Sequence, residues 1–137
     1  MIINLQAISP FRKSNLTVTL LLSTLLLCGS LYASTSNKWR MEFSGKAHSD
    51  GTIVVRITPK DGEPITAEIA IEDKTGENNV AKAVVKGLKA QLPEDDYKVE
   101  RDDGEDVLIK KKFGKSNFGL EVISNDVKNV RINLDKE

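Results

Sequence analysis

The sequence predicts an α+β fold in which about seven strands, mostly antiparallel and joined as hairpins, pack on one amphipathic helix in the order βββαββββ. Two observations support this fold class. Several short runs alternate apolar and polar residues, as half-buried strands do. One stretch, residues 75–92, instead repeats its apolar residues every three or four positions, which is typical of a helix.

Three glycines mark turns between the alternating runs. The tripeptides Ser-Asp-Gly at residues 49–51, Lys-Asp-Gly at 60–62 and Asp-Asp-Gly at 102–104 each separate two such runs. A three-residue hairpin loop combines a type I turn with a residue of positive φ, a conformation in which glycine carries no steric penalty. We therefore expect three hairpins, each closed by one of these loops.

The three loops fix registers that can be checked against the apolar pattern. Each register places apolar residues opposite apolar residues, whereas a second loop shorter by one residue would set Val55 opposite Glu68. The predicted pairs are Phe43–Ile57 and Ala47–Ile53 at the first loop, Ile57–Ile65, Val55–Ala67 and Ile53–Ile69 at the second, and Val99–Val107 and Tyr97–Ile109 at the third.

The predicted helix presents one apolar stripe to the sheet. Its main members recur every four residues and are Val80, Val84, Leu88 and Leu92. Thr75 is the expected N-cap, and Glu77 lies in the first turn, where the helix dipole favours a negative charge. Pro93 is expected to end the helix, because the residue before a proline disfavours helical backbone.

The remaining residues are predicted to form further strands. A tight turn at residues 113–116 would align Ile109 with Leu120 and Val107 with Val122. Residues 129–134 alternate in the same way and supply the last strand. The pattern leaves open which strands are neighbours across the helix.

Residues 1–33 are predicted to be a secretory signal peptide. Arg12 and Lys13 precede an uncharged apolar core at residues 16–27, and Ala33 offers a small residue at the cleavage site. The core is shorter than the roughly 20 apolar residues that span a bilayer. A lipoprotein anchored through Cys28 and an uncleaved membrane anchor are the alternatives. We therefore expect one domain at residues 34–137, in the periplasm or outside the cell and with no membrane span after cleavage.

The charge of this domain argues against nucleic acid as a partner. Arg12 and Lys13 are the only charged residues among the first 33, so residues 34–137 hold 18 of the 20 basic residues and all 20 acidic ones, a net charge near −2. A nearly balanced surface provides no long-range field that would attract a polyanion. No cysteine follows residue 33, so disulfides cannot stabilise the domain.

The acidic cluster around Gly104 is the first candidate for a site. Asp102, Asp103, Glu105 and Asp106 surround this glycine. An EF-hand calcium loop with its invariant glycine at this position would place Lys110 where the bidentate glutamate belongs. We therefore interpret the cluster as a solvated hairpin tip, with a weak cation contact as the alternative.

Two other motifs resemble catalytic or phosphate-binding elements only superficially. The segment Phe-Gly-Lys-Ser at residues 113–116 ends like a P-loop, but Ile109 stands where the first glycine is required and a strand follows in place of a helix. His48 is the only histidine, and it has no second histidine or cysteine with which to bind zinc. We therefore expect no catalytic residue, no metal site and no cofactor.

The densest basic run provides the one candidate for partner binding. Its members are Lys110, Lys111, Lys112 and Lys115. The structural interpretation is a solvated strand end whose charges discourage edge-to-edge aggregation. The functional interpretation is a contact for an anionic partner, which would weaken with added salt.

The order of elements resembles that of a known module. The segments GTIVVRI, EPITAEIAI, TGENNVAKAVVKGLKAQL, DYKVE, DGEDVLIK and SNFGLEVIS, between residues 51 and 124, are similar to the β-β-α-β-β modules of flagellar hook-associated proteins (the hook IN motif) and phage tail sheath proteins. The run from Trp39 to Ala47 adds a strand to that pattern, and a cleavable export signal is foreign to it. The resemblance implies a fold and a packing role, and no activity.

The sequence as a whole favours a secreted or periplasmic binding or structural domain without catalytic activity, whose partner would be a protein or an envelope polymer. The alternative is a small hydrolase that acts on an envelope polymer and whose carboxylates converge only in three dimensions. A pocket that holds two acids would favour the hydrolase, whereas an exposed sheet edge would favour the binding domain.

Overall fold

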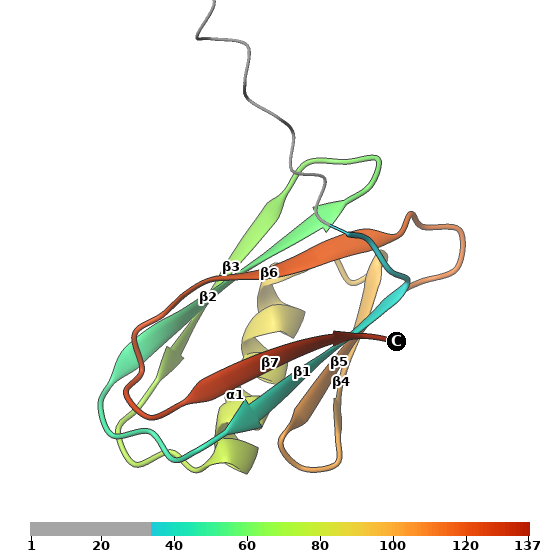
Figure 1. The fold of residues 1–137 in the computed structure, drawn as a ribbon. Coiled ribbons are helices and arrows are strands. Elements are labelled where there is room, and N and C mark those ends of the chain that lie inside the picture. The colour runs from blue at the N-terminus through green and yellow to red at the C-terminus, as the bar shows by residue number, and fades with distance from the viewer. Residues whose placement is uncertain (1–33) are drawn as a thin grey trace, which may run out of the picture. The chain divides into compact units, whose positions relative to one another are not determined.

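The computed structural model describes residues 34–137, so the predicted signal peptide and Cys28 lie outside the described residues. Seven strands and one helix follow the predicted order βββαββββ, and the fold is α+β as predicted (Figure 1). The elements are β1 (Lys38–Ser44), β2 (Gly51–Pro59), β3 (Ile65–Ile71), α1 (Glu77–Gln91), β4 (Tyr97–Asp102), β5 (Asp106–Lys111), β6 (Phe118–Asn125) and β7 (Arg131–Lys136).

The strands form two antiparallel sheets. One has the order β4-β5-β1-β7 and the other the order β3-β2-β6. Helix α1 packs against β3 and β4, which are edge strands of different sheets, and so covers the opening between them on one side of the molecule (Figure 1). This arrangement places two sheet edges beside the helix.

The inward faces of both sheets and of the helix share one apolar core. The alternation of β1 sends Trp39, Met41 and Phe43 inward, and all three are buried. The largest side chains with less than 2% exposure are Phe43, Phe118, Met41, Ile53, Ile57, Leu88, Ile109, Val55, Val80, Val84 and Val107. Their burial is the main favourable contribution to folding, because the hydrophobic effect scales with the apolar area removed from water.

The register predicted for the second hairpin is confirmed. Strands β2 and β3 pair Ile57 with Ile65, Val55 with Ala67 and Ile53 with Ile69. The loop does not need positive φ at Gly62, since the chain bends over the longer connection at residues 60–64. The apolar alternation on both strands was therefore sufficient to fix their pairing.

The first predicted hairpin is wrong. Strand β1 pairs with β5 and β7 in one sheet, whereas β2 belongs to the other sheet. Residues 45–50 connect the two sheets, and they bond to the loop before the helix, since the Ala47 amide donates to the Thr75 carbonyl at 2.8 Å. The alternation of β1 matches several strands equally well, so a local turn motif could not identify its true neighbours.

The third predicted hairpin forms, but its register is shifted by two residues. Val99 pairs with Ile109 instead of the predicted Val107, and Val107 lies opposite Arg101. The three-residue loop therefore lies at 103–105, with positive φ at both Asp103 (42°) and Gly104 (75°). An even shift leaves each side chain on its predicted face, so the apolar pattern could not detect the error.

The predicted pairing of β5 with β6 is also wrong. Ile109 pairs with Trp39 and Val99, whereas Leu120 pairs with Ile57 of the other sheet. Residues 112–117 thus cross between the sheets instead of forming a tight hairpin. The last strand begins two residues later than predicted and pairs with β1.

Helix α1 carries the predicted stripe. Val80, Val84, Leu88 and Leu92 are all buried, and the helix ends before Pro93 as expected. The N-cap is Gly76 and not Thr75, whose hydroxyl instead donates to the Glu72 carbonyl at 2.7 Å. Thr75 therefore stabilises the turn before the helix and leaves its first amides without a side-chain cap.

Candidate functional site

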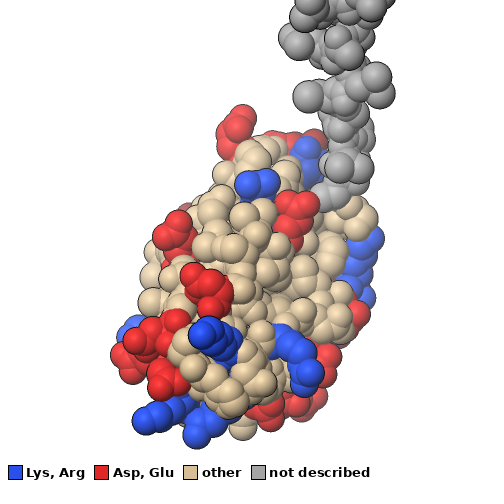
Figure 2. Space-filling view, turned by 60° about the vertical axis from the view of Figure 1, so that its left-hand side comes forward, with Lys and Arg blue, Asp and Glu red and all other residues tan. Residues whose placement is uncertain are grey.

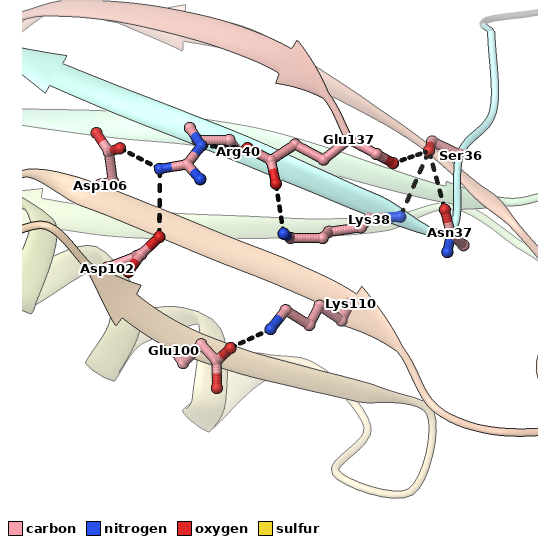
Figure 3. A network of polar contacts seen from close by, with 9 residues as sticks. All are labelled: Ser36, Asn37, Lys38, Arg40, Glu100, Asp102, Asp106, Lys110 and Glu137. Carbon is pink, nitrogen blue, oxygen red and sulfur yellow. Dashed lines mark hydrogen bonds and ion pairs between the residues drawn. The ribbon is translucent and has the colours of Figure 1, made fainter.

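Three of the four lysines singled out in the sequence make contacts within the domain. Lys110 forms an ion pair with Glu100 of β4 (Figure 3). The Lys115 ammonium lies 2.7 Å from Asp96, and this bond raises the lysine's pKa above its usual value. Lys111 donates to the Lys115 carbonyl at 2.7 Å. Lys112 makes no ion pair with any residue of the described domain and is free to contact a partner.

Lys112 lies on the rim of a groove between the end of α1 and the edge strand β4. The groove has a volume of about 490 Å³. Its lining consists of Lys89, Leu92, Glu94, Tyr97, Lys98, Val99, Glu100 and Lys112. Leu92, Tyr97 and Val99 are each at most 6% exposed, so they form an apolar floor beneath charged side chains. An apolar floor with a few polar groups around it is the usual composition of a binding site.

The rim of the groove is basic in a domain whose net charge is negative. Lys98 lies 2.8 Å from Glu100, which also binds Lys110, so one glutamate is shared by two lysines. The hydrogen bonds from Lys110 and then Lys98 lower the pKa of Glu100 to about 2. Lys89 and Lys112 add two positive charges, and Glu94 removes one. The groove therefore carries a local excess of positive charge.

The backbone of β4 faces this groove at its unpaired edge. The Lys112 amide donates to the Asp96 carbonyl at 2.8 Å, which marks the pair of residues 96 and 112 as hydrogen bonded. Hydrogen-bonded pairs alternate along an antiparallel ladder, so Tyr97, Val99 and Arg101 direct their amide and carbonyl groups away from β5. The Tyr97 amide confirms this direction, because it donates to the Pro93 carbonyl and not to β5.

The edge of β3, on the other side of α1, is closed by a side chain. The Gln91 amide accepts a hydrogen bond from the Glu68 backbone N–H at 2.9 Å and donates one to the Glu68 carbonyl, also at 2.9 Å. These are the two bonds that a neighbouring strand would make at that position. One residue of α1 thus blocks the edge of β3, and no hydrogen bond of this kind reaches Val99 from the described residues.

Phe113 is a candidate for partner binding that the sequence pattern did not single out. It follows Lys112 on the crossing between the sheets, and its side chain is fully exposed. The other aromatic residues of the domain are buried in the core. The sequence offered a cue, since Phe113 interrupts the lysine run, but an aromatic residue next to a strand is also a normal core residue. Only its position on the crossing shows that it faces water.

The outer face of the four-stranded sheet holds a network of ion pairs instead of a cleft. Arg40 on β1 reaches Asp106 and Glu137 at 2.5 Å each and Asp102 at 3.3 Å (Figure 3). Hydrogen bonds from Arg40 and then Lys38 lower the pKa of Glu137 to about 2. Long charged side chains can cover apolar surface with their stems.

Such coverage explains an unexpected buried residue on this face. Leu108 lies opposite Arg40 and Glu100 in the register, and it points away from the core. It is nevertheless only 4% exposed. The ion-pair network therefore covers Leu108 and shields it from water, which is a structural role.

The arrangement of acids gives no support to the hydrolase alternative. Asp102 and Asp106 do come together, but both bind the same arginine. Glu100 and Glu137 have lowered pKa values, whereas a general acid in glycoside hydrolysis requires a raised one. Within residues 34–137, no group of three or more His, Cys, Asp or Glu side chains has the geometry to hold a metal ion.

The rest of the surface carries both signs of charge. Acidic and basic side chains are interspersed over the face drawn in Figure 2, with uncharged residues between them. His48 lies on the surface, as expected for a histidine beside a turn. In the part of the chain that the structure describes, α1 is too short and too polar to cross a membrane.

Comparison with models of known protein families finds no match to this chain, and comparison with curated proteins finds none either. The resemblance to hook-associated and tail sheath modules therefore stays a prediction based on the order of the elements. The features of the described domain that could bind a partner are the groove, the unpaired edge of β4 and the exposed Phe113.

Proposed function

We propose that residues 34–137 form a binding domain without catalytic activity, and that it binds a protein through a surface formed by the α1–β4 groove and Phe113. The observation that carries this proposal is the exposure of Phe113, the residue that directly follows Lys112 of the groove lining. Aromatic residues that are central to interfaces contribute a large share of the binding energy, because they lose much water-exposed apolar surface on association. Polar and basic rims commonly surround such anchors.

A protein partner fits this surface better than a membrane does. Lys111 and Lys115 next to Phe113 are occupied by contacts within the domain, so Lys112 is the one uncommitted lysine of the run. Each lysine near an anionic membrane contributes about 1 kcal/mol, and stable anchoring needs several such charges or an inserted chain. A single lysine and one phenylalanine fall short of that requirement.

The proposed location is outside the cytoplasm, after removal of residues 1–33. This part of the proposal rests on the basic start, the apolar core at residues 16–27 and Ala33. Intact-mass measurement of the native protein is expected to show a chain that begins at Ser34. A mass that includes residues 1–33, or an acyl group on Cys28, would contradict it.

The binding surface is tested by capture of crosslinked partners from an envelope extract with the 34–137 domain. We expect Phe113→Ser and Lys112→Glu each to abolish capture of the proteins that the unmodified domain retains. Ile123→Ser is the matched control, because Ile123 is also an exposed large hydrophobic residue but lies on β6. Lys128→Glu is the control for charge, since Lys128 is exposed and lies outside the groove.

The pattern across the four variants decides the outcome. Loss of capture with Phe113→Ser and Lys112→Glu, and retention with the two controls, supports the proposed surface. Capture that survives both groove variants, or that is lost equally in the controls, overturns it. Thermal unfolding of each variant shows that the domain remains folded.

A further inference from the structure

The geometry points to an extended acidic polypeptide segment as the ligand of the groove, which pairs with the free edge of β4 as an added strand. This inference deepens the proposed function and rests on it. It adds the chemical class of the ligand and the way in which the ligand is held. Backbone pairing supplies affinity in this mode of recognition, and side-chain pockets supply specificity.

The first support is the backbone of β4. Val99 and Arg101 direct their amides and carbonyls away from β5, and Val99 lines the groove. An unpaired edge is a template for another strand unless side chains or loops cover it. The groove therefore offers both unpaired hydrogen-bonding groups and the space beside them.

The second support is the difference between β4 and other edges. Gln91 occupies the edge of β3 at Glu68. Ser36 occupies the end of the β6 edge, because it exchanges two backbone hydrogen bonds of 2.9 Å with Phe118. Comparable bonds at Val99 are not formed by any described residue. The edge of β4 thus combines open backbone groups at Val99 with a lined cavity beside them.

The third support is charge complementarity. Lys98 lies opposite Lys110 on the outer side of the ladder, and Lys112 extends the same alternation. Side chains of an added strand alternate between the two sides, with those on one side about 7 Å apart. Acidic residues on the outer side would meet Lys98 and Lys112, while apolar residues on the inner side would meet Leu92 and Val99. The expected ligand alternates acidic and apolar residues.

A displayed library of random eight-residue peptides, selected on the 34–137 domain, tests this expectation. We expect the selected peptides to carry Asp or Glu at alternate positions, with apolar residues between them. A peptide of the dominant sequence is then synthesised with N-methyl groups on alternate amides, in two versions that block opposite edges of the strand. One version is expected to bind about tenfold or more weakly, and the other to bind as the parent does.

Amide hydrogen exchange provides a readout that a merely electrostatic contact would not change. In the free domain, the amides of Val99 and Arg101 are expected to exchange faster than those of Lys98 and Glu100, which pair with β5. Addition of the selected peptide is expected to slow exchange at Val99 and Arg101 selectively. Lys98→Glu together with Lys112→Glu is expected to weaken binding by about tenfold or more, and Lys128→Glu to leave it unchanged.

Failure of this inference is distinguishable from failure of the proposed surface. The inference is overturned if no peptide is selected, or if the selected peptides lack acidic residues or the two-residue period. It is also overturned if both N-methylated versions bind equally well or if exchange at Val99 does not change. In each of these cases the capture experiment with Phe113→Ser and Lys112→Glu decides independently whether the surface binds a protein. Binding of an acidic polysaccharide such as alginate in place of peptides also overturns the polypeptide as the ligand.

Discussion

The edges of β3 and β4, which both lie beside α1, differ in whether a side chain occupies their backbone groups. On the β3 side, the Gln91 side chain makes both hydrogen bonds that a neighbouring strand would make at Glu68. On the β4 side, the helix leaves a groove of about 490 Å³ next to Val99, with lysines at its rim. The same helix therefore closes one edge and leaves the other accessible.

This difference shows how a small domain can leave the edge of β4 available without general aggregation. An edge that exposes backbone groups risks pairing with any other strand, and charged residues reduce that risk. Lysines around β4 disfavour basic partners and limit self-association, and under the proposed function they would favour an acidic ligand. Gln91 thus protects the edge of β3 at Glu68, whereas the edge of β4 is the one at which we propose ligand binding.

The largest expected effect comes from Leu88, which is fully buried on α1, the helix that packs beside both edges. Leu88→Ala is expected to lower the free energy of unfolding by about 2–5 kcal/mol, because it leaves a cavity at a fully buried position. Denaturant titration measures this change. Lys86→Ala, on the exposed side of the same helix, is the control and is expected to change stability by less than about 0.5 kcal/mol. Equal effects of the two variants would contradict the assigned orientation of α1.

The next effect concerns Gly104, which closes the β4–β5 hairpin and so holds the open edge in place. Gly104→Ala is expected to cost about 1–2 kcal/mol, because a Cβ is disfavoured at its φ of 75°. Asp103→Asn is expected to be nearly silent, since asparagine also tolerates positive φ.

Denaturant titration with calcium and with a chelator separates this turn from a cation site. Calcium is expected to leave the stability of both variants unchanged. A harmless Gly104→Ala, combined with calcium-dependent stability that is lost in Asp103→Asn, would show that the acidic tip binds a cation.

Gln91→Ala removes the side chain that occupies the edge of β3 at Glu68. We expect a loss of about 1 kcal/mol or less, since the amide bonds lie near solvent and water can replace them. Amide exchange at Glu68 should become faster, while exchange at Val99 stays as fast as before. Gln91→Glu is the control, because its carboxylate can still accept the bond from the Glu68 amide. Unchanged exchange at Glu68 in Gln91→Ala would show that β3 is protected by other means.

The smallest expected effect is a pH dependence from Glu100 on β4. Its pKa in the folded domain, about 2, lies below the usual 4.5, so the ionised form stabilises the fold above pH 4.5. This contribution is lost as the pH falls from 4.5 toward 2. Glu100→Gln is expected to flatten the decrease of stability over that interval in thermal melts. Glu94→Gln is the control, because Glu94 is an exposed acid of the same groove. If both variants lose stability equally between pH 4.5 and 2, the ion pairs of Glu100 with Lys110 and Lys98 do not stabilise the fold.

The local structure of this domain can be predicted from its sequence. The two-residue and 3.6-residue periods predicted the strands and the helix, because burial of one face imposes these periods on the chain. They fixed the α+β class, the element order, the buried stripe of α1 and the pairing of β2 with β3. The positive φ of Gly104 was also predicted, since a tight turn requires it locally.

Which strands are neighbours depends on long-range packing and does not follow from the sequence pattern. Alternation records which side chains face inward but not which strand lies alongside, so β1 and β5 were given wrong partners. The lysine run was visible in the sequence, but its division into paired lysines and the free Lys112 depends on Glu100 and Asp96, which the fold brings together. The exposure of Phe113 follows from the crossing between two sheets. Long-range pairing therefore created the candidate surface, because no local pattern encodes contacts between distant segments.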